Sequence, residues 1–513
     1  MGLMAYFRLI RAGFVLAREG AFSLVDAKEL PPPARLGLGI VRLFERRDVK
    51  KTGRVARLQQ ALVRLGPTYV KFGQTLATRP DIVGPDIAED LSGLQDALPP
   101  FDQGLLPDIL RDALGGRADD LLEISGPVAA ASIAQVHQAR LRRADGGIDI
   151  VAVKILRPGI EDRFGADIES YYAGARLAEA LMPKLRRLKP LAVVETLDRS
   201  AKLELDLRFE AAAISEYAES LTEDQNFSCP DVRWNHTSKR VLTTNWLEGI
   251  SVRDLEALDK AGIDRKALAS RILLGFLKQA IGTGFFHADM HPGNMFVDGT
   301  SGRVLMVDFG IMGRISMRER RFLAEVLYGF ITRNYLRIAQ LHIDIGYVPA
   351  TENVDDFASA LRTVGEPMHG RSARDISMAK VLGQLFTITE LFNMQTRPEL
   401  IMLQKNMVLA EGVARMVDPD LDIWEVARPF VSEWVREQAG PRGKLAELRE
   451  HGERVISTMG KIPDLVDKAE NVLSAHEEEF ARHRRSGPSL PLSWTLGIAM
   501  IAALAGFLFA RIF

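Results

Sequence analysis

Residues 286–296 read FHADMHPGNMF, and Asp308-Phe-Gly follows at the end of a strand-like run, 303–308. Asp289 and Asn294 lie in the first stretch, which has a loop-like composition. An asparagine and an aspartate on adjoining turns can hold Mg²⁺ through oxygen ligands and bridge it to phosphates. In phosphoryl transfer of the kinase type, the loop aspartate orients or deprotonates the nucleophile. The pattern therefore predicts Asp289 as a catalytic residue and Asn294 and Asp308 as metal ligands.

An apolar strand upstream contains a lysine. Residues 148–156 read IDIVAVKIL, and 135–141 alternates as a partner strand across a turn at 145–147. Residues 240–246 form a further predicted strand. Burying a lysine is costly unless an anion compensates it. Lys154 is therefore expected to face a cleft and to contact the phosphates of a nucleotide as a second catalytic residue.

A lysine in this role needs a glutamate from a nearby helix, and residues 200–213 have a helical pattern. Glu204 is the predicted partner of Lys154, with Asp206 and Glu210 as further acids. Asp206 and Glu210 are four positions apart, so they share a helix face that excludes Glu204. A solvated face is an equally open interpretation of that pair.

Two histidines flank the loop aspartate. His287 and His291 are four positions apart, a spacing that suggests zinc on a helix, but here they lie in a loop. We expect a structural role instead, with His287 hydrogen-bonded to backbone near Asp308.

The ordered set Lys154, Asp289, Asn294 and Asp308 resembles the UbiB-type atypical protein-kinase-like family of ubiquinone biosynthesis, over about residues 65–314. The resemblance implies binding of ATP and Mg²⁺. Residues 127–137, PVAAASIAQVH, match the alanine-rich loop of the family. The implied nucleotide contacts in this loop are Ala129, Ala130, Ala131 and Ser132. A typical kinase has glycines here, and methyl groups restrict the backbone positions that glycine permits.

Two further motifs match the same family. Its K-x-G-Q motif is matched by Lys71, Gly73 and Gln74. The resemblance implies that this helical extension folds over the kinase cleft and blocks peptide substrates. Glu204-Leu-Asp206 matches the E-x-D motif, followed by Glu210. These acids are implied to regulate the extension, which leaves open whether Glu204 also holds Lys154.

The segment after Gly310 is short and lacks an A-P-E motif, and a helical pattern begins at Met317. This favours an ATPase or a kinase of small molecules or lipids over a protein kinase. An older family label, 2-polyprenylphenol hydroxylase, has no support, because no dinucleotide-binding turn or iron-ligand cluster stands out.

Both ends of the chain suggest a membrane. Residues 492–510 contain no charge and would span about 28 Å as a helix. Basic residues precede them, namely Arg482, Arg484 and Arg485. The positive-inside rule then predicts a single-pass anchor in the bacterial inner membrane with the main body in the cytoplasm. A buried core helix is the alternative, and Ala502 with Gly506 could pack two anchors into a homodimer.

The N-terminal segment is basic. Residues 1–71 contain fourteen Lys/Arg and five Asp/Glu. Apolar residues recur at helical spacing at Met4, Phe7, Ile10 and Phe14, with arginines between them. This amphipathic helix is expected either to lie on anionic membrane lipids or to pack on the domain with a solvated basic face.

Composition limits the remaining possibilities. The chain has 513 residues, a formal charge of −1 and one cysteine, Cys229. These values argue against nucleic-acid binding and a disulfide framework. We predict an α+β, bilobal protein-kinase-like fold with a helical N-terminal extension and a C-terminal transmembrane helix. The predicted boundaries are 1–115 for the extension, 116–250 and 251–440 for the two lobes, 441–491 for a charged spacer and 492–510 for the anchor.

Three functional hypotheses follow from the sequence and the resemblance. The first is a kinase or ATPase that supports ubiquinone biosynthesis, with prenyl-quinone precursors and other proteins of that pathway as partners. The second is a pseudokinase scaffold that binds nucleotide as a switch. The third is an ATP-driven factor that extracts lipid precursors from the bilayer.

Overall fold

The computed structural model describes residues 3–24, 43–46, 54–77, 87, 91, 94, 99–181, 190–221, 226–368, 384–385, 388, 391–394 and 398–439. The chain divides into two compact units, Met1–Phe430 and Val431–Phe513, and only 431–439 are described in the second. The predicted spacer and anchor lie outside the described residues. No helix formed by the described residues has the length and apolar character needed to cross a membrane.

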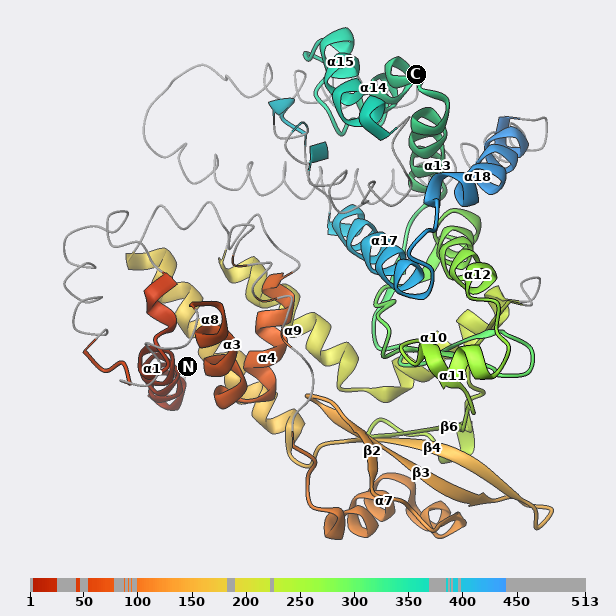
Figure 1. Cartoon of the computed structure of the whole chain (residues 1–513). Coiled ribbons are helices and arrows are strands. Elements are labelled where there is room, and N and C mark those ends of the chain that lie inside the picture. The colour runs from red at the N-terminus through yellow and green to blue at the C-terminus, as the bar shows by residue number, and fades with distance from the viewer. Residues whose placement is uncertain are drawn as a thin grey trace, which may run out of the picture. The chain divides into compact units, whose positions relative to one another are not determined.

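A five-stranded antiparallel sheet carries Lys154 (Figure 1). Its strands are β1 (Leu121–Leu122), β3 (Ala134–Arg142), β4 (Ile148–Leu156) and β6 (Val241–Asn245) in this order, with β2 (Pro127–Ala130) also pairing with β3. Alternate residues of β4 point to opposite faces. Val151, Val153 and Ile155 pack in a core with helix α7 (Leu106–Leu114), so Lys154 lies on the other face. The predicted strands are confirmed.

Short strands carry the two aspartate loops. The first set runs β5 (Phe227–Ser228), β10 (Val304–Met306), β9 (Met295–Val297) and β7 (Ile250–Ser251). A second set pairs β8 (Phe285–His287) with β11 (Met312–Arg314). The strand-like run 303–308 contains β10, which forms a hairpin with β9, with Val304 opposite Val297. The loop with Asp289 follows β8, and Asp308 follows β10.

Apart from the short strands β8 to β11, the described chain after β7 contains mainly helices. They are α11 (Leu255–Lys260), α12 (Arg265–Leu277), α13 (Met317–Thr332), α14 (Tyr335–Asp344), α15 (Val354–Gly365), α17 (Pro398–Val417) and α18 (Ile423–Ala439). Helix α12 continues into a π-helical turn, Lys278–Thr283. That turn ends at Gly284, whose φ of +75° suits glycine. Helix α17 packs against α12.

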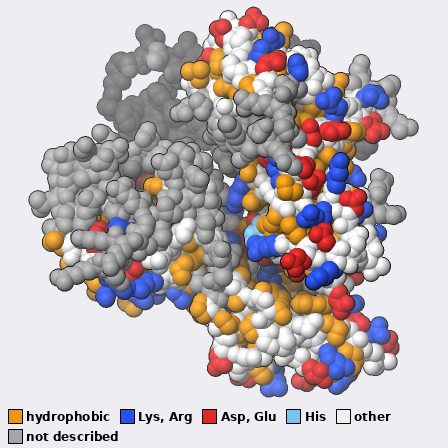
Figure 2. Space-filling model, viewed as in Figure 1, with side chains coloured by type: hydrophobic (Ala, Val, Ile, Leu, Met, Phe, Trp, Pro, Cys, Tyr) orange, Lys and Arg blue, Asp and Glu red, His pale blue; other side chains and the backbone are white. Residues whose placement is uncertain are grey.

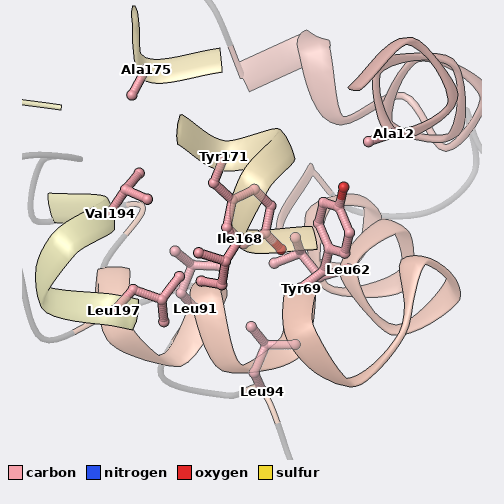
Figure 3. Packing of buried hydrophobic residues seen from close by; sticks show 10 residues of the cluster. All are labelled: Ala12, Leu62, Tyr69, Leu91, Leu94, Ile168, Tyr171, Ala175, Val194 and Leu197. Carbon is pink, nitrogen blue, oxygen red and sulfur yellow. The ribbon is translucent and has the colours of Figure 1, made fainter. Parts of the chain in front are cut away.

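The described part of the N-terminal extension is helical, as predicted. Its helices α1 (Leu3–Arg18), α3 (Arg54–Leu65) and α4 (Pro67–Ala77) pack with α8 (Ile160–Leu181) and α9 (Pro190–Glu204). Figure 3 shows their shared apolar cluster, in which Tyr69 from α4 meets Tyr171 from α8. The two ring centroids are 5.1 Å apart in an edge-to-face arrangement, which is favourable for aromatic pairs.

Helix α1 buries alanines and exposes several large apolar side chains. Its alanines, Ala5, Ala12 and Ala17, are the buried side, and α1 packs against α8. The large apolar residues are exposed, with relative accessibilities of 66% for Met4, 60% for Phe7, 68% for Ile10 and 47% for Phe14. The helix therefore buries small residues against the domain and leaves these four large apolar side chains accessible.

Charged side chains of both signs are interspersed over the described part of the face shown in Figure 2. This mixture agrees with the balanced total of 66 basic and 67 acidic residues.

Candidate active site

Lys154 is the centre of a charged cluster. Its Nζ lies 2.8 Å from Glu210 Oε1 and 2.9 Å from Asp308 Oδ1. Burial alone would lower the pKa of Lys154, but the two carboxylates outweigh burial and raise it. The same lysine lowers the pKa of Asp308. For Glu210, burial raises the pKa while the lysine opposes the rise. A charged Lys154 therefore holds together two elements that are far apart in sequence.

The expected pairing of Lys154 with Glu204 is wrong, because the structure places Glu210 against the lysine. The predicted helix over 200–213 is broken into α9, which ends at Glu204, and α10 (Leu207–Ser220). The Asp206 side chain caps α10 by accepting the Arg208 N–H at 3.2 Å. The break turns Glu204 and Glu210 towards different lysines.

The Asp308 backbone adopts a conformation that is uncommon for a residue with a side chain. Its φ is +61°, which aspartate tolerates better than most residues do. The buried His287 supports it, since Nε2 lies 2.8 Å from the Asp308 carbonyl oxygen. The Asp289 N–H donates to His287 Nδ1 at 3.2 Å, so Nε2 carries the proton and donates to Asp308. The predicted hydrogen bond from His287 to backbone near Asp308 is confirmed.

Burial also lowers the pKa of His287, which favours the neutral ring that these two hydrogen bonds require. The neighbouring His291 has a different role, because its Nδ1 accepts the Gly293 N–H at 2.6 Å. Both imidazoles therefore shape the loop around Asp289.

Asn294 and Asp289 contact each other directly. Asn294 Nδ2 donates to Asp289 Oδ2 and to the Asp289 carbonyl, both at 3.1 Å. Within the described part of the chain, Asn294 Oδ1 and Asp308 Oδ2 have no hydrogen-bond partner. Hard oxygen ligands of this kind suit Mg²⁺, which takes its remaining ligands from water and phosphates. The residues present therefore fit the predicted metal.

The alanine-rich loop is fastened to the sheet. Ala129 and Ala130 belong to β2, opposite Val136 and Gln135 of β3. The Ala131 N–H donates to the Ala134 carbonyl at 2.8 Å. Ser132 is buried, whereas Ala129 is exposed.

Arg157, directly after β4, also forms hydrogen bonds with this loop. Its guanidinium donates to the Ala131 carbonyl through Nε at 3.1 Å and through Nη2 at 2.9 Å. Its Nη1 also donates to the Pro99 carbonyl at 2.9 Å. The loop is therefore held in place without the glycines of a typical kinase.

Lys71 of the extension forms an ion pair with Glu204. Its Nζ lies 2.6 Å from Glu204 Oε2, and each side chain is only 12% exposed. Gly73 is tightly packed, because an added Cβ would lie 2.5 Å from Leu94 and 2.7 Å from Leu62. Gln74 reaches the Leu94 carbonyl at 3.4 Å. The extension thus contacts the end of α9, just before α10, the helix that carries Glu210.

Two buried amides near the Asp289 loop were not predicted. Gln279 Oε1 accepts the His287 N–H at 3.1 Å, and Gln279 Nε2 donates to the Tyr217 hydroxyl at 2.8 Å. Asn406, on α17, contacts the backbone on both sides of Asp289. The sequence feature that could have pointed to them is a polar residue on the apolar face of a helix.

A surface cavity of about 510 Å³ lies elsewhere, at the β3–β4 hairpin end of the same sheet. Arg143, Arg233 and Trp234 line it, and Asp149 pairs with both arginines. None of the predicted site residues line this cavity.

The lysine on a central strand, its glutamate on a helix and the two aspartate loops define the fold and site of a protein-kinase-like protein. Comparison with family models agrees. The ABC1 atypical kinase-like domain matches residues 93–342, and the UbiB helical domain matches residues 361–422. The kinase-like match includes Lys154, Glu210, Asp289 and Asp308.

Proteins described as "Probable protein kinase UbiB" are similar over most of their length. The one from Marinobacter nauticus is 38% identical over 469 residues, covering 90% of this chain and 84% of that protein. The one from Pseudomonas putida is 35% identical, covering 99% of this chain and 93% of that protein. The chain therefore belongs to the UbiB family of atypical kinase-like proteins.

A solved structure of Rv3197 with erythromycin, from Mycobacterium tuberculosis, has a related fold. The TM-score is 0.51 at 22% identity, and the match covers 69% of this chain and 90% of that one. At this level of identity the similarity concerns the fold alone.

Proposed function

We propose that this chain binds Mg-ATP and transfers or hydrolyses its terminal phosphate in support of ubiquinone biosynthesis. The observation that carries this proposal is the position of Lys154 Nζ between Glu210 and Asp308. A lysine held by a helix glutamate next to a metal-binding aspartate is the arrangement that phosphoryl transfer of the kinase type needs.

Each residue has a distinct part in this proposal. Lys154 contacts the phosphates of ATP, and Glu210 keeps its ammonium group in place. Asn294 and Asp308 supply the oxygen ligands for Mg²⁺, which when bound neutralises charge on the phosphates. Asp289 orients the attacking hydroxyl or water and accepts its proton. The alanine-rich loop, including Ala129 and Ser132, covers the phosphates.

Removal of the metal tests this proposal at the level of binding. We expect ATP to bind the full-length chain with Mg²⁺ present and at least tenfold more weakly after chelation, because the phosphates then lose their bridge to Asn294 and Asp308. Isothermal titration calorimetry measures both affinities, and restoring Mg²⁺ is the control. Equal affinity with and without Mg²⁺ would remove the role assigned to both residues.

We also propose that the extension controls access to the site. The Lys71–Glu204 ion pair supports this, since it lies at the end of α9, and α10 with Glu210 begins three residues later. A docked extension favours small or lipid-linked acceptors over peptides. Asp206 contributes by capping α10 and so fixing where that helix begins.

We further propose that the protein works at the cytoplasmic face of the inner membrane. The uncharged segment 492–510 would anchor it, and helix α1 would contact anionic lipids. The exposed Phe7 and Ile10 support the second contact, as does Arg11, which is also exposed. Prenyl-quinone precursors and other proteins of ubiquinone biosynthesis are the partners expected there.

Vesicle sedimentation tests the contribution of α1. In a chain shortened by residues 492–513, we expect Phe7→Glu with Ile10→Glu to lower partitioning into phosphatidylglycerol vesicles at least tenfold. Two large apolar side chains would otherwise leave water on binding. Leu336→Glu is the matched control, because Leu336 is exposed on α14. If both changes weaken binding equally, α1 has no specific role at the membrane.

The anchor has its own expected result. Removal of 492–513 should weaken membrane association, and the remaining binding should fall at high salt, which screens the basic helix. A shortened chain that still sediments fully with vesicles at high salt would contradict a dominant role for the anchor.

A further inference from the structure

One side chain from the helical region, Asn406, forms two hydrogen bonds with the Asp289 loop. Asn406 lies on α17, within the segment matched by the UbiB helical domain and outside the kinase-like match. Its side chain is fully buried. Asn406 Oδ1 accepts the Met290 N–H at 2.9 Å, and Nδ2 donates to the His287 carbonyl at 2.5 Å. The two hydrogen bonds bracket Asp289.

The amide of Asn406 supplies both groups that this contact needs. One atom must accept from a backbone N–H while its neighbour donates to a carbonyl, and only a group with both an acceptor and a donor can do so. Aspartate in place of Asn406 would keep the acceptor but would set a carboxylate oxygen against the His287 carbonyl. Leucine would fill the space and leave both backbone groups without a partner.

The bracketed loop is tied to the rest of the site. The His287 ring donates to the Asp308 carbonyl and accepts the Asp289 N–H. On the other side, the His287 N–H is bonded to Gln279, which also bonds Tyr217 of α10. A shift at the His287 carbonyl would therefore move Asp289 relative to Asp308. Displacement of a reacting group by about 1 Å can cost about a hundredfold in rate.

We propose that Asn406 is a positioning residue for Asp289, and that the helical region thereby forms part of the phosphoryl-transfer machinery. This inference rests on the proposed function. Asn406 acts through the loop, so its loss should lower kcat for ATP turnover while leaving KM nearly unchanged. Among the hydrogen bonds of the described residues, none joins Asn406 to Lys154 or Glu210, which are assigned to nucleotide binding.

The test uses the full-length chain, with Asn406→Asp and Asn406→Leu compared with Lys405→Ala, an exposed position on the same helix. We expect kcat to fall about 10- to 100-fold in both Asn406 variants, with KM for ATP within threefold of the wild-type value. Lys405→Ala should match wild type. Hydrogen exchange measured by mass spectrometry should rise in the peptide covering 285–294 but not in α12.

A double-mutant cycle separates positioning from general weakening of the fold. In an Asp289→Asn background, Asn406→Leu should lower kcat less than twofold further, because the group it positions is already disabled. A full additional 10- to 100-fold loss in that background would overturn the proposal. So would a rise in exchange spread equally over α12 and α17, which indicates a structural role alone.

The outcome is also distinguishable from failure of the proposed function. If wild type and Asp308→Asn release phosphate at the same rate, the proposed function fails. Hydrogen exchange then tests separately whether Asn406 holds the loop in place. Unchanged exchange over 285–294 in Asn406→Asp and Asn406→Leu would also overturn the inference that Asn406 holds this loop.

Discussion

Replacing Lys154 by methionine is expected to lower the rate of ATP turnover by about 10²- to 10³-fold. The ammonium group supplies the positive charge that meets the phosphates, and methionine fills similar space without it. The loss should appear in kcat/KM, measured as phosphate release at several ATP concentrations. Lys239→Met is the matched control, because Lys239 is an exposed lysine paired with Glu161.

Loss of Lys154 also leaves acids without their cation, so stability must be measured alongside turnover. Breaking a buried ion pair by removing one partner costs about 3–5 kcal/mol. The double variant Lys154→Met with Glu210→Gln removes the positive charge and the more buried of its two partners together. It should regain thermal stability and remain inactive. If it regains turnover as well, Lys154 acts only through the fold.

The second large effect concerns the extension. Glu204→Lys should release α4 from α9, because Lys71 would then face another ammonium group in a largely buried site. At a cost of about 3 kcal/mol, protection of α4 amides from hydrogen exchange should fall about a hundredfold. Released chains should also phosphorylate peptide acceptors that the wild-type chain does not use.

Charge reversal at both positions is the control for this prediction. Lys71→Glu combined with Glu204→Lys restores an opposite-charge pair and should recover most of the protection. Protection that is lost equally in the single and double variants would mean that the ion pair does not dock the extension. Protection lost without any gain of peptide phosphorylation would contradict its proposed control of access.

Local patterns were sufficient for much of the fold. The apolar, β-branched run 148–156 predicted β4, and in the structure one face of that strand packs on a core while the other carries Lys154. The loop with Asp289 and Asn294 was also predicted, because proline and glycine exclude a helix there. The strand that precedes Asp308, β10, was recognisable from the apolar run 304–307.

Contacts between distant segments were harder to predict. Glu204 and Glu210 appear on one continuous helical pattern, and only the cap at Asp206 reveals that two helices meet there. Asn406 forms its hydrogen bonds with a loop more than a hundred residues earlier in the chain, so its place among the apolar residues of α17 makes it noticeable but does not indicate its partner. The orientation of α1 was likewise undecided, since either its alanines or its large apolar residues could have faced the domain.

The most direct test of the central claim is phosphate release from Mg-ATP by the full-length chain, compared between wild type, Asp308→Asn and Asp298→Asn. Asp298 is a matched control, because it caps the turn between β9 and β10. We predict turnover in wild type and Asp298→Asn and a loss of at least a hundredfold in Asp308→Asn. Equal rates in all three proteins would contradict a phosphoryl-transfer site built around Lys154, Glu210 and Asp308.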